Sequence, residues 1–437
     1  GTDVNGPTAV LKSAAKIDHL RTGGTLLNQK FSPQIFEGED SINKIISLIG
    51  VRRCGKTFLF YHTMRQLIAS GIDKRNILYL NFEDDRLFPI DSQQLDMILK
   101  AYHELYPEKI SEKKYLFFDE IQNIANWEKY IRRIHDTENV LIFLTGSSSE
   151  FLARDISTAL RGRSISYQLA PLSFREYLSF KDITYNAYSS RSQALVKSEL
   201  INYLTYGGFP EIVLTDQKII KEKILAEYID LIQYKDMVER YKTTNQYLLK
   251  YLLKFCLTHP ANLLSVNKLF NDFKALGMSL SKNTIYEYLD YMQESFIISL
   301  HSKYSGSLRK QAQNPKKIYT IDNGLMLHFQ PDAMSDIGYK LENAVAAELR
   351  KKYTDIFYYS NQFEVDFLIK TKNSILLYNV ADNINDMNTA RREIAALTKA
   401  AENFADSKAF LILKEQNEPE INAPVEVVPI IDFLLEK

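Results

Sequence analysis

The fold of the first part of the chain is decided by Gly50-Val51-Arg52-Arg53-Cys54-Gly55-Lys56-Thr57, which follows the pattern G-x-x-x-x-G-K-T. This stretch lies between an apolar run at 45–49 and a helix-like run that begins at Phe58. A loop in this context binds phosphate, because its glycines let backbone N–H groups surround the anion and the helix N-terminus adds a positive dipole end. We therefore expect residues 50–58 to bind a nucleotide.

Two side chains of this loop have expected roles toward ATP and Mg²⁺. Lys56 is expected to reach the β- and γ-phosphates, and the Thr57 hydroxyl is expected to ligate Mg²⁺. The alternative is a simple glycine turn between a strand and a helix. That alternative leaves the lysine unexplained, so the pattern favours a nucleotide site.

Farther along the chain, an apolar strand at 115–118 ends in Asp119 and Glu120. Asp119 is placed to hold Mg²⁺ beside Thr57, and Glu120 is placed to polarise an attacking water as a general base. A pair of carboxylates alone is common at a solvated strand end. Combined with the phosphate-binding loop, it favours hydrolysis over nucleotide binding alone.

Short apolar segments alternate with amphipathic ones through residue 170, which predicts a parallel sheet covered by helices on both faces. Nucleotide binds such sheets at the carboxyl edge of the strands. The predicted strands are Lys44–Ile49, Asn76–Phe82, Tyr115–Phe118, Val140–Thr145 and Ile165–Leu169, and the predicted helices are Thr57–Ser70, Asp91–Leu105 and Trp127–His135.

Polar residues after the fourth predicted strand are further candidates for catalysis. Thr145 or Ser147 could sense the γ-phosphate, although a serine-rich turn that caps the next helix is also consistent with this segment. Arg161 and Arg163 follow, and one of them could reach the phosphate of a neighbouring subunit in a homo-oligomer. Alternatively, these arginines pair with carboxylates of their own subunit.

Composition describes an ordinary soluble globular chain. Its 437 residues carry zero formal net charge, so any surface for nucleic acid must be local. The two cysteines, Cys54 and Cys256, cannot form a disulfide framework and favour a cytoplasmic location. No apolar run approaches the roughly 20 residues of a membrane span, so no membrane partner is expected.

Taken together, the motifs resemble those of a known family, the predicted ATPases of the AAA+ superfamily that carry an additional C-terminal domain of poorly defined function. The resemblance covers nearly the whole chain and implies an ATPase core over residues 1–170. It rests on segments 52–57, 118–120, 145–148, 162–163, 171–177 and 206–211.

The pattern of apolar residues in the middle of the chain predicts helices. We expect two domains there, residues 171–240 and residues 241–330. Helical spacing at 171–240 fits a lid that, in the resembled family, packs beside the nucleotide domain. Three helices and two strands at 241–330 predict a winged helix, where we count eleven lysines or arginines and five aspartates or glutamates. The start of the third helix and a basic hairpin, together 281–317, are candidates for DNA contact; packing between domains is the alternative. The hairpin's basic residues are Lys303, Arg309, Lys310, Lys316 and Lys317.

The last predicted domain, 335–437, resembles the restriction-endonuclease-like α/β fold. That fold implies Mg²⁺ ligands at Glu342 and Asp366. The third acid and the lysine of its motif are replaced by Asn379 and Ala381, so we predict no metal-dependent cleavage, unless a lysine elsewhere, such as Lys370, takes the role.

The sequence thus predicts an α/β multidomain protein with a sandwiched P-loop sheet, a helical lid, a winged helix and a nuclease-like domain. The predicted function is hydrolysis of ATP with Mg²⁺ to drive conformational change, acting on or near DNA. The alternative is a regulatory or scaffold switch that binds ATP and holds a protein partner without DNA.

Overall fold

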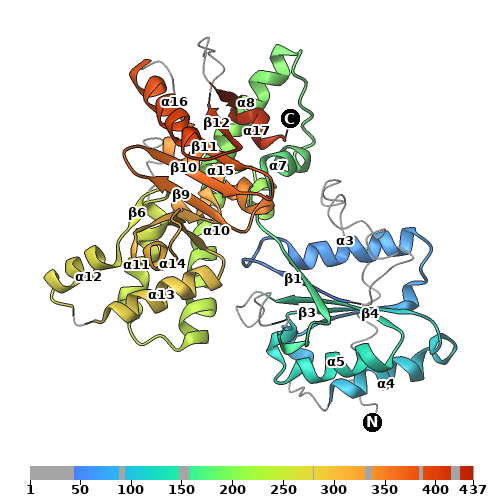
Figure 1. Cartoon of the computed structure of the whole chain (residues 1–437). Helices are drawn as coiled ribbons and strands as arrows, with labels where there is room; N and C mark the ends of the chain where they lie inside the picture. Colours follow the sequence, from blue (N-terminus) through green and yellow to red (C-terminus); the bar gives the residue numbers. More distant parts are fainter. Residues whose placement is uncertain are drawn as a thin grey trace. The chain divides into compact units, whose positions relative to one another are not determined.

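The computed structural model consists of two compact units, residues 1–170 and 171–437 (Figure 1). It describes residues 44–87, 94–146, 156, 158–278, 280–329, 337–382, 387–414 and 424–436.

The first unit contains a five-stranded sheet in the order β2-β3-β4-β1-β5, and every neighbouring pair is parallel. Each predicted strand is present, with ends that differ by one residue at most. The strands are β1 (Ile45–Ile49), β2 (Ile77–Asn81), β3 (Lys114–Asp119), β4 (Val140–Gly146) and β5 (Ser164–Gln168). The helices are α3 (Lys56–Ala69), α4 (Leu95–Leu105) and α5 (Trp127–Thr137), with short 3₁₀ turns at Lys74–Asn76, Asp85–Leu87, Pro107–Lys109 and Ile121–Asn123.

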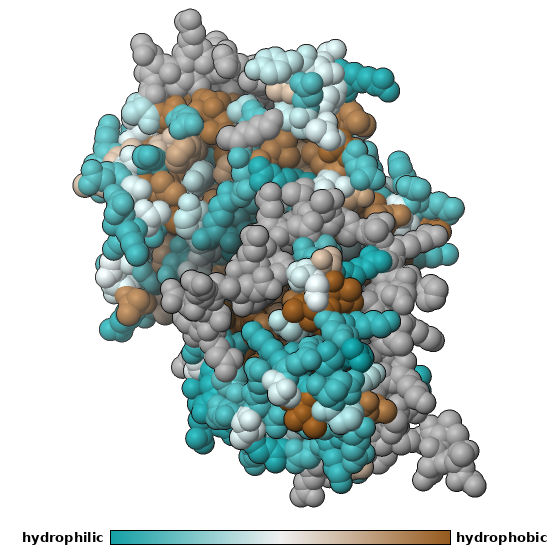
Figure 2. All heavy atoms as spheres, turned by 90° about the vertical axis from the view of Figure 1, so that its right-hand side faces the viewer, coloured by the Kyte–Doolittle hydropathy of each residue, from teal (hydrophilic) through white to brown (hydrophobic). Residues whose placement is uncertain are grey.

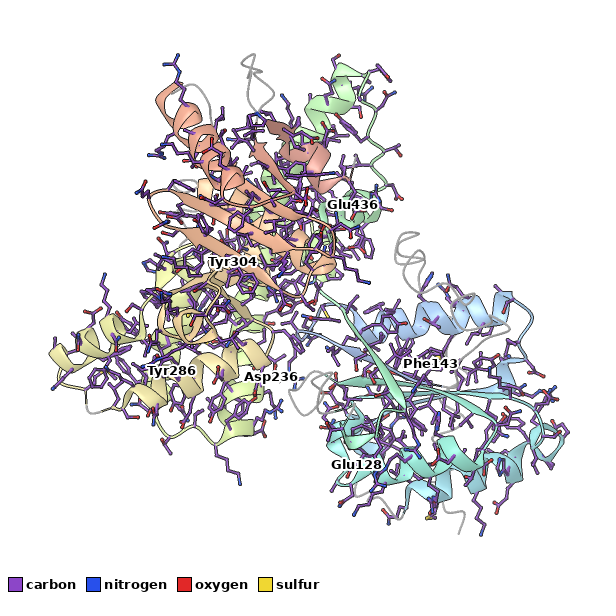
Figure 3. All side chains as sticks on the ribbon, viewed as in Figure 1. Glu128, Phe143, Asp236, Tyr286, Tyr304 and Glu436 are labelled. Atoms are coloured by element: carbon purple, nitrogen blue, oxygen red, sulfur yellow. The ribbon has the colours of Figure 1, made fainter. Side chains whose placement is uncertain are left out.

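Stacked aromatic rings fill the core between this sheet and α3. The rings of Phe117 and Phe143 stack with centroids 4.4 Å apart, and Phe60 of α3 meets Phe117 edge-on at 5.2 Å. Figure 3 shows Phe143 within the sheet. Because β4 lies between β1 and β3, the carboxyl ends of these three strands meet at one edge, which is where the candidate site forms.

The second unit begins with helices that pack on the C-terminal part of the chain. Ser173 starts α7 with a capping box, in which its side chain accepts from the Glu176 N–H and Glu176 reaches back to Ser173. Apolar residues of α7 and α8 share one buried cluster with Leu341 and Val345. A role of 171–240 as a lid over nucleotide stays a prediction. The elements are α7 (Phe174–Phe180), α8 (Ser190–Tyr206), α9 (Pro210–Val213), α10 (Lys218–Leu231) and a π-helical segment, Ile232–Glu239.

The elements predicted for the winged helix occur in the expected order, with two additions. A two-residue strand, β6, pairs with β8, and a short helix, α14, lies between β7 and β8 where a hairpin was expected. These elements are α11 (Gln246–Thr258), β6 (Leu263–Leu264), α12 (Val266–Ala275), α13 (Lys282–Glu294), β7 (Ile298–Lys303), α14 (Leu308–Gln313) and β8 (Lys316–Thr320), followed by a 3₁₀ turn at Asn323–Met326.

The C-terminal elements follow an α-β-β-β-α-β order and end in a further strand and helix. They are α15 (Ile337–Lys352), β9 (Ile356–Ser360), β10 (Glu364–Lys370), β11 (Ile375–Ala381), α16 (Met387–Glu402), β12 (Ser407–Leu413), β13 (Val425–Pro429) and α17 (Ile430–Leu434). A parallel pairing of β7 with β9 joins these strands to those of 241–330 in one eight-stranded sheet, β13-β12-β11-β10-β9-β7-β8-β6. The two predicted domains therefore share a sheet within one unit.

Two contacts distant in sequence close the second unit. The buried carboxylate of Asp322 accepts from the Gly208 N–H at 2.7 Å and from the Gly324 N–H at 2.8 Å. Glu436, near the end of the chain (Figure 3), pairs with Arg175 of α7 at 3.1 Å. These contacts tie α7 and the turn after α8 to the C-terminal part of the unit.

Among the described residues, no helix is long and apolar enough to cross a membrane. Figure 2 shows one face of the molecule, on which apolar side chains form separate patches among hydrophilic ones.

Candidate functional site

The phosphate-binding loop, residues 50–57, joins β1 to α3 through backbone conformations that favour glycine. Gly50 has φ +147° and Gly55 has φ +105°. A Cβ at Gly50 would come within 2.1 Å of the Leu169 carbonyl oxygen, so no side chain fits there. Burial raises the pKa of the Cys54 thiol, which therefore packs inside the loop in its neutral form.

Lys56 is the first residue of α3, and its side chain folds back over the loop. Its Nζ atom donates to the backbone carbonyls of Gly50 at 3.0 Å and Val51 at 3.1 Å. The ammonium is therefore held above the loop by groups that a phosphate oxygen can replace. Phe58, which follows Thr57, is 70% exposed and forms no part of the core.

Asp119 lies at the carboxyl end of β3 and accepts hydrogen bonds from three hydroxyl groups. Thr57 Oγ1 donates to Oδ2 at 2.7 Å, Tyr79 donates to the same oxygen at 3.0 Å, and the Thr145 hydroxyl donates to Oδ1. Burial raises the pKa of Asp119, and the hydroxyl donors offset part of this effect. The structure thus brings together Thr57 and Asp119, the two predicted Mg²⁺ ligands.

Glu120 follows in the left-handed conformation, with φ +53°, where β3 ends and a 3₁₀ turn begins. Its backbone N–H donates to Thr145 Oγ1 at 2.9 Å, and its carboxylate accepts from Gln122 Nε2 at 2.5 Å. Thr145 therefore ties the positions of Asp119 and Glu120 together. Burial, followed by the charge of Glu120, raises the pKa of nearby Glu83, which lies 3.5 Å from Arg52 of the loop.

Two members of this cluster, Tyr79 and Gln122, were missed by sequence reasoning. Tyr79 belongs to β2 and reaches Asp119 only because β2 pairs with β3. A tyrosine in an apolar strand carries no signal of such a role. Gln122, two residues after Glu120, could have been found as a polar neighbour on the same turn.

The other predicted catalytic residues lie apart from this cluster or outside the described residues. Arg163 pairs with Asp136 of α5 in the same unit through two bonds of 2.9 Å, which is the alternative that the sequence left open. Arg161 is exposed and has φ +51°. Ser147 lies outside the described residues. A role of either arginine in a neighbouring subunit stays a prediction.

Glu342 and Asp366 of the C-terminal domain also lie close together, but a lysine stands between them. Lys317 Nζ is 3.2 Å from Glu342 Oε1 and 2.9 Å from Asp366 Oδ1. Asn379 accepts from the Asp366 N–H at 3.0 Å, while Lys370 is exposed at the opposite end of β10. In the part of the chain that the structure describes, no three acidic, histidine or cysteine side chains are grouped so as to hold a metal ion.

Comparison with known proteins gives a family for the chain. A family model described as an AAA domain matches residues 42–178, and two models described as domains of unknown function (DUF8612 and DUF4143) match 197–335 and 337–433. The uncharacterized protein MJ1544 of Methanocaldococcus jannaschii is 38% identical over 367 residues, which cover 82% of this chain and 79% of that protein. The chain belongs to the same family, within the P-loop ATPases of the AAA+ superfamily.

A second member of this AAA+ family, an uncharacterized protein of Haemophilus influenzae, is 31% identical over 92% of this chain and 96% of its own length. Because the two relatives align over most of their lengths, the similarity extends well beyond the AAA domain. Neither relative's name describes an activity.

Structural comparison adds only weak likenesses. The Aeropyrum pernix ORC1 protein in complex with DNA is 11% identical, with 70% of this chain and 89% of that chain covered. AMPPCP-bound DnaA from Aquifex aeolicus is 14% identical, with 65% and 92% covered. The TM-score is 0.28 in both cases.

The N-terminal stretch has a separate similarity. A family model described as glycine radical matches residues 1–66. Trans-4-hydroxy-L-proline dehydratase of Clostridioides difficile is 55% identical over 49 residues, which are 11% of this chain and 6% of that enzyme. So small a share of the enzyme transfers no activity to the AAA+ chain.

Proposed function

We propose that the chain hydrolyses ATP with Mg²⁺ at the phosphate-binding loop. One observation carries the proposal: the Thr57 hydroxyl lies 2.7 Å from the Asp119 carboxylate, with Lys56 preceding Thr57 and Glu120 following Asp119 in the chain. Hydroxyl and carboxylate oxygens are the ligands that Mg²⁺ prefers in nucleotide sites, and the loop supplies the backbone N–H groups that phosphates need.

In the proposed mechanism, the residues of the loop bind and orient the nucleotide. Lys56 exchanges its bonds to the Gly50 and Val51 carbonyls for bonds to the β- and γ-phosphates. Thr57 and Asp119 would hold Mg²⁺, which would neutralise the charge that develops on the phosphates when it is bound. With Mg²⁺ bound, the Thr57 hydroxyl would serve as a ligand of the cation in place of its present bond to Asp119.

Glu120 is the proposed general base. Its carboxylate accepts the proton of the attacking water, and Gln122 orients that carboxylate through the 2.5 Å bond. Thr145 links Asp119 to the Glu120 backbone, so a change at the γ-phosphate can be transmitted to the base through one side chain. Arg161 or Arg163 completes the site in a homo-oligomer, where Arg163 would first have to leave Asp136.

Turnover is proposed to drive a conformational change that acts on or near DNA through residues 281–317. At the start of α13, Lys282 and Asn283 are exposed, Thr284 is half-buried, and Tyr286 is 51% exposed (Figure 3). In a helix-turn-helix protein this end of the helix meets the base edges. These exposed residues support a local DNA surface on a chain without net charge.

A hollow of about 470 Å³ beside this helix-and-strand region suits a phosphate group. It is lined by Lys303, Lys310, Tyr304 and Tyr359, among others, so that cations and aromatic rings share one wall. Lys317 must be removed from the predicted basic surface, because it is buried and paired with carboxylates. A lysine in a short basic segment was predicted to be exposed; the alternation of β8 turns it inward.

The alternative function is a regulatory switch or scaffold that binds ATP with slow turnover and holds a protein partner without DNA. The shared buried core of α7, α8 and α15 supports it, because this core joins the three helices beneath one surface that a partner could contact. DNA-dependence of turnover separates the two functions.

The test is phosphate release from ATP by wild type, Lys56→Ala and the control Lys100→Ala, which changes an exposed lysine of α4. Wild type and the control are expected to turn over ATP only with Mg²⁺, and Lys56→Ala is expected to lose both ATP binding and turnover. Stimulation by DNA supports the first function, and slow turnover unchanged by DNA supports the second. Undiminished turnover in Lys56→Ala would reject a role for the loop in hydrolysis.

A further inference from the structure

Three carboxylates of the second unit surround a single buried ammonium. Lys317 Nζ lies 2.8 Å from Glu364 Oε1, 2.9 Å from Asp366 Oδ1 and 3.2 Å from Glu342 Oε1. The lysine side chain is only 4% exposed. Three oxygens from three side chains therefore converge on one point, and that point holds a positive charge.

The strand pattern explains why these groups meet. Alternate residues of a strand point to the same face, so Lys317 and Tyr319 of β8 share one face, as do Glu364 and Asp366 of β10. Glu342 of α15 contacts both residues of β8: Tyr319 donates to its Oε1 at 2.7 Å, alongside the Lys317 contact. The cluster thus joins β8, from 241–330, to elements from the C-terminal domain.

Neutral groups hold the Asp366 carboxylate in place independently of the lysine. The Val380 N–H donates to Asp366 Oδ2 at 3.0 Å. Asn379 accepts from the Asp366 N–H at 3.0 Å and donates to Glu393 at 2.7 Å. Fixed partners of this kind orient the ligands of metal sites. Asn379 stands where the nuclease-like fold has an acid. Here its side-chain amide holds the backbone of Asp366 and the carboxylate of Glu393.

Lys317 faces three carboxyl groups within 3.2 Å of its ammonium, so the acidic groups of the cluster outnumber its basic one. Burial disfavours the ammonium, but the carboxylates of Asp366, Glu342 and Glu364 raise the pKa of Lys317 well above its usual value. One ammonium faces three carboxyl groups, so the lysine supplies the positive charge at the point where their oxygens converge.

The cluster is open to solvent on one side. A hollow of about 650 Å³ is lined by Glu342, Glu364 and Asp366, with Glu393, Arg392 and Lys399 among the other lining residues. A hydrated ion could reach the carboxylates through this hollow and keep several of its waters, as Mg²⁺ and similar cations usually do.

We propose that the Lys317 ammonium is the built-in cation of this site. It stands where a divalent metal ion would bind Glu342, Glu364 and Asp366. Removal of the ammonium alone therefore creates a divalent-cation site. Distances of 2.8–3.2 Å to the nitrogen need to shorten by roughly 1 Å to reach the 2.0–2.2 Å typical of Mg²⁺ or Mn²⁺ with oxygen ligands. Glutamate side chains can make that adjustment by rotamer changes. The proposal does not rest on ATP hydrolysis.

The test is a Mn²⁺ titration of the full chain without nucleotide, with free Mn²⁺ followed by electron paramagnetic resonance. Wild type, Lys317→Met, Lys317→Met with Asp366→Asn, and the control Lys316→Met are compared. Lys316 is the neighbouring lysine on the other face of β8. Lys317→Met is expected to bind one Mn²⁺ more than wild type, at least tenfold more tightly than any weak binding of wild type, and the added Asp366→Asn is expected to abolish it. Because all four proteins share the same phosphate-binding loop, Mn²⁺ held there cancels in the comparison.

Metal rescue of folding gives a second readout. The melting temperature of Lys317→Met is expected to rise with Mn²⁺ and not with an equal concentration of a monovalent salt, and this rise is expected to disappear with Asp366→Asn. The proposal is overturned if Lys317→Met gains no Mn²⁺ site, or if Lys316→Met gains the same one. Should Lys317→Met fail to fold, Lys317→Gln replaces it under the same criteria. Wild type is also compared with the single variant Asp366→Asn. If wild type binds Mn²⁺ and Asp366→Asn does not, the proposal is overturned, because the site would then accept a metal ion with Lys317 in place.

Discussion

Two carboxylate clusters of this chain, one around Asp119 and one around Asp366, are stabilised by different groups: neutral hydroxyls in the first and a charged lysine in the second. At the end of β3, the donors to Asp119 are hydroxyl groups, and within the described residues Asp119 forms no ion pair. At the C-terminal cluster, Lys317 contributes a full positive charge to three carboxylates at once. Both clusters lie at the ends of sheet strands and both use a tyrosine as an additional donor.

The difference concerns what each cluster can still bind. Neutral hydroxyl donors satisfy the hydrogen bonds of Asp119 without neutralising its charge, so attraction for a cation remains. In the second cluster, the Lys317 ammonium both donates hydrogen bonds to the carboxylates and neutralises part of their charge. A metal ion could bind there only by displacing this ammonium. Acidic residues in a motif therefore indicate a metal site only when the charge around them is also known.

The largest effect is expected for Glu120→Gln in the first cluster. The amide cannot accept the proton of water, so the turnover rate should fall by roughly 10²–10⁴-fold, while ATP still binds because the side-chain shape is kept. Single-turnover phosphate release and equilibrium ATP binding measure the two quantities. Glu104→Gln, an exposed change on α4, serves as the control. A rate within a few-fold of wild type would remove Glu120 from the mechanism.

Next in size is the effect of Lys317→Met on folding. Loss of one partner leaves buried carboxylates without compensation, which should lower the free energy of unfolding by about 3–5 kcal/mol in metal-free buffer. Lys316→Met should change it by no more than about 0.5 kcal/mol. Urea unfolding of the two variants checks this. Equal effects would mean that the cluster does not depend on its ammonium.

Asp322 offers an intermediate case, a buried carboxylate satisfied by two backbone N–H groups. Burial raises its pKa to about 6 in the folded chain. The folded state then binds its proton more tightly than the unfolded state, so this group's contribution to stability falls as pH rises from about 4 to about 6. Asp322→Asn should remove that slope and cost about 1–3 kcal/mol, because its amide N–H faces a backbone donor. Unfolding measured across this pH range in both proteins is the check, and an unchanged slope would contradict the assignment.

The smallest effect is expected at basic residues of this region that, unlike Lys317, are not buried: Lys303 is half-buried and Lys310 is exposed. If Lys303 and Lys310 contact phosphates, Lys303→Ala with Lys310→Ala should reduce the slope of log affinity for DNA against log salt by about 2. Fluorescence anisotropy at several salt concentrations measures it. Lys197→Ala with Lys223→Ala removes the same charge from exposed positions of α8 and α10, and an equal loss in that control would mean that the effect is not local.

The strands and the phosphate-binding loop of the first unit were predictable because their signals are local. Apolar runs bounded by turns place each strand within one residue, and the G-x-x-x-x-G-K-T pattern specifies its own backbone. The meeting of Thr57 with Asp119 also followed, since both lie at the carboxyl edge of one parallel sheet.

The environment of Lys317 was not predictable for the opposite reason. Its burial depends on α15 and β10, which lie farther along the chain, and on the pairing of β7 with β9. Locally, Lys316-Lys317 resembles a solvated basic pair. The one available signal was the apolar character of the residues that follow, Ile318-Tyr319, which indicates a strand with one buried face but not which lysine shares it.

The most direct test of this account counts metal ions in the wild-type chain with a non-hydrolysable ATP analogue present. We predict one tightly bound Mn²⁺ per chain, lost in Asp119→Asn and retained in Asp366→Asn. The account is contradicted if Mn²⁺ binding survives Asp119→Asn and disappears with Asp366→Asn, because the C-terminal cluster, and not the phosphate-binding loop, would then be the metal site.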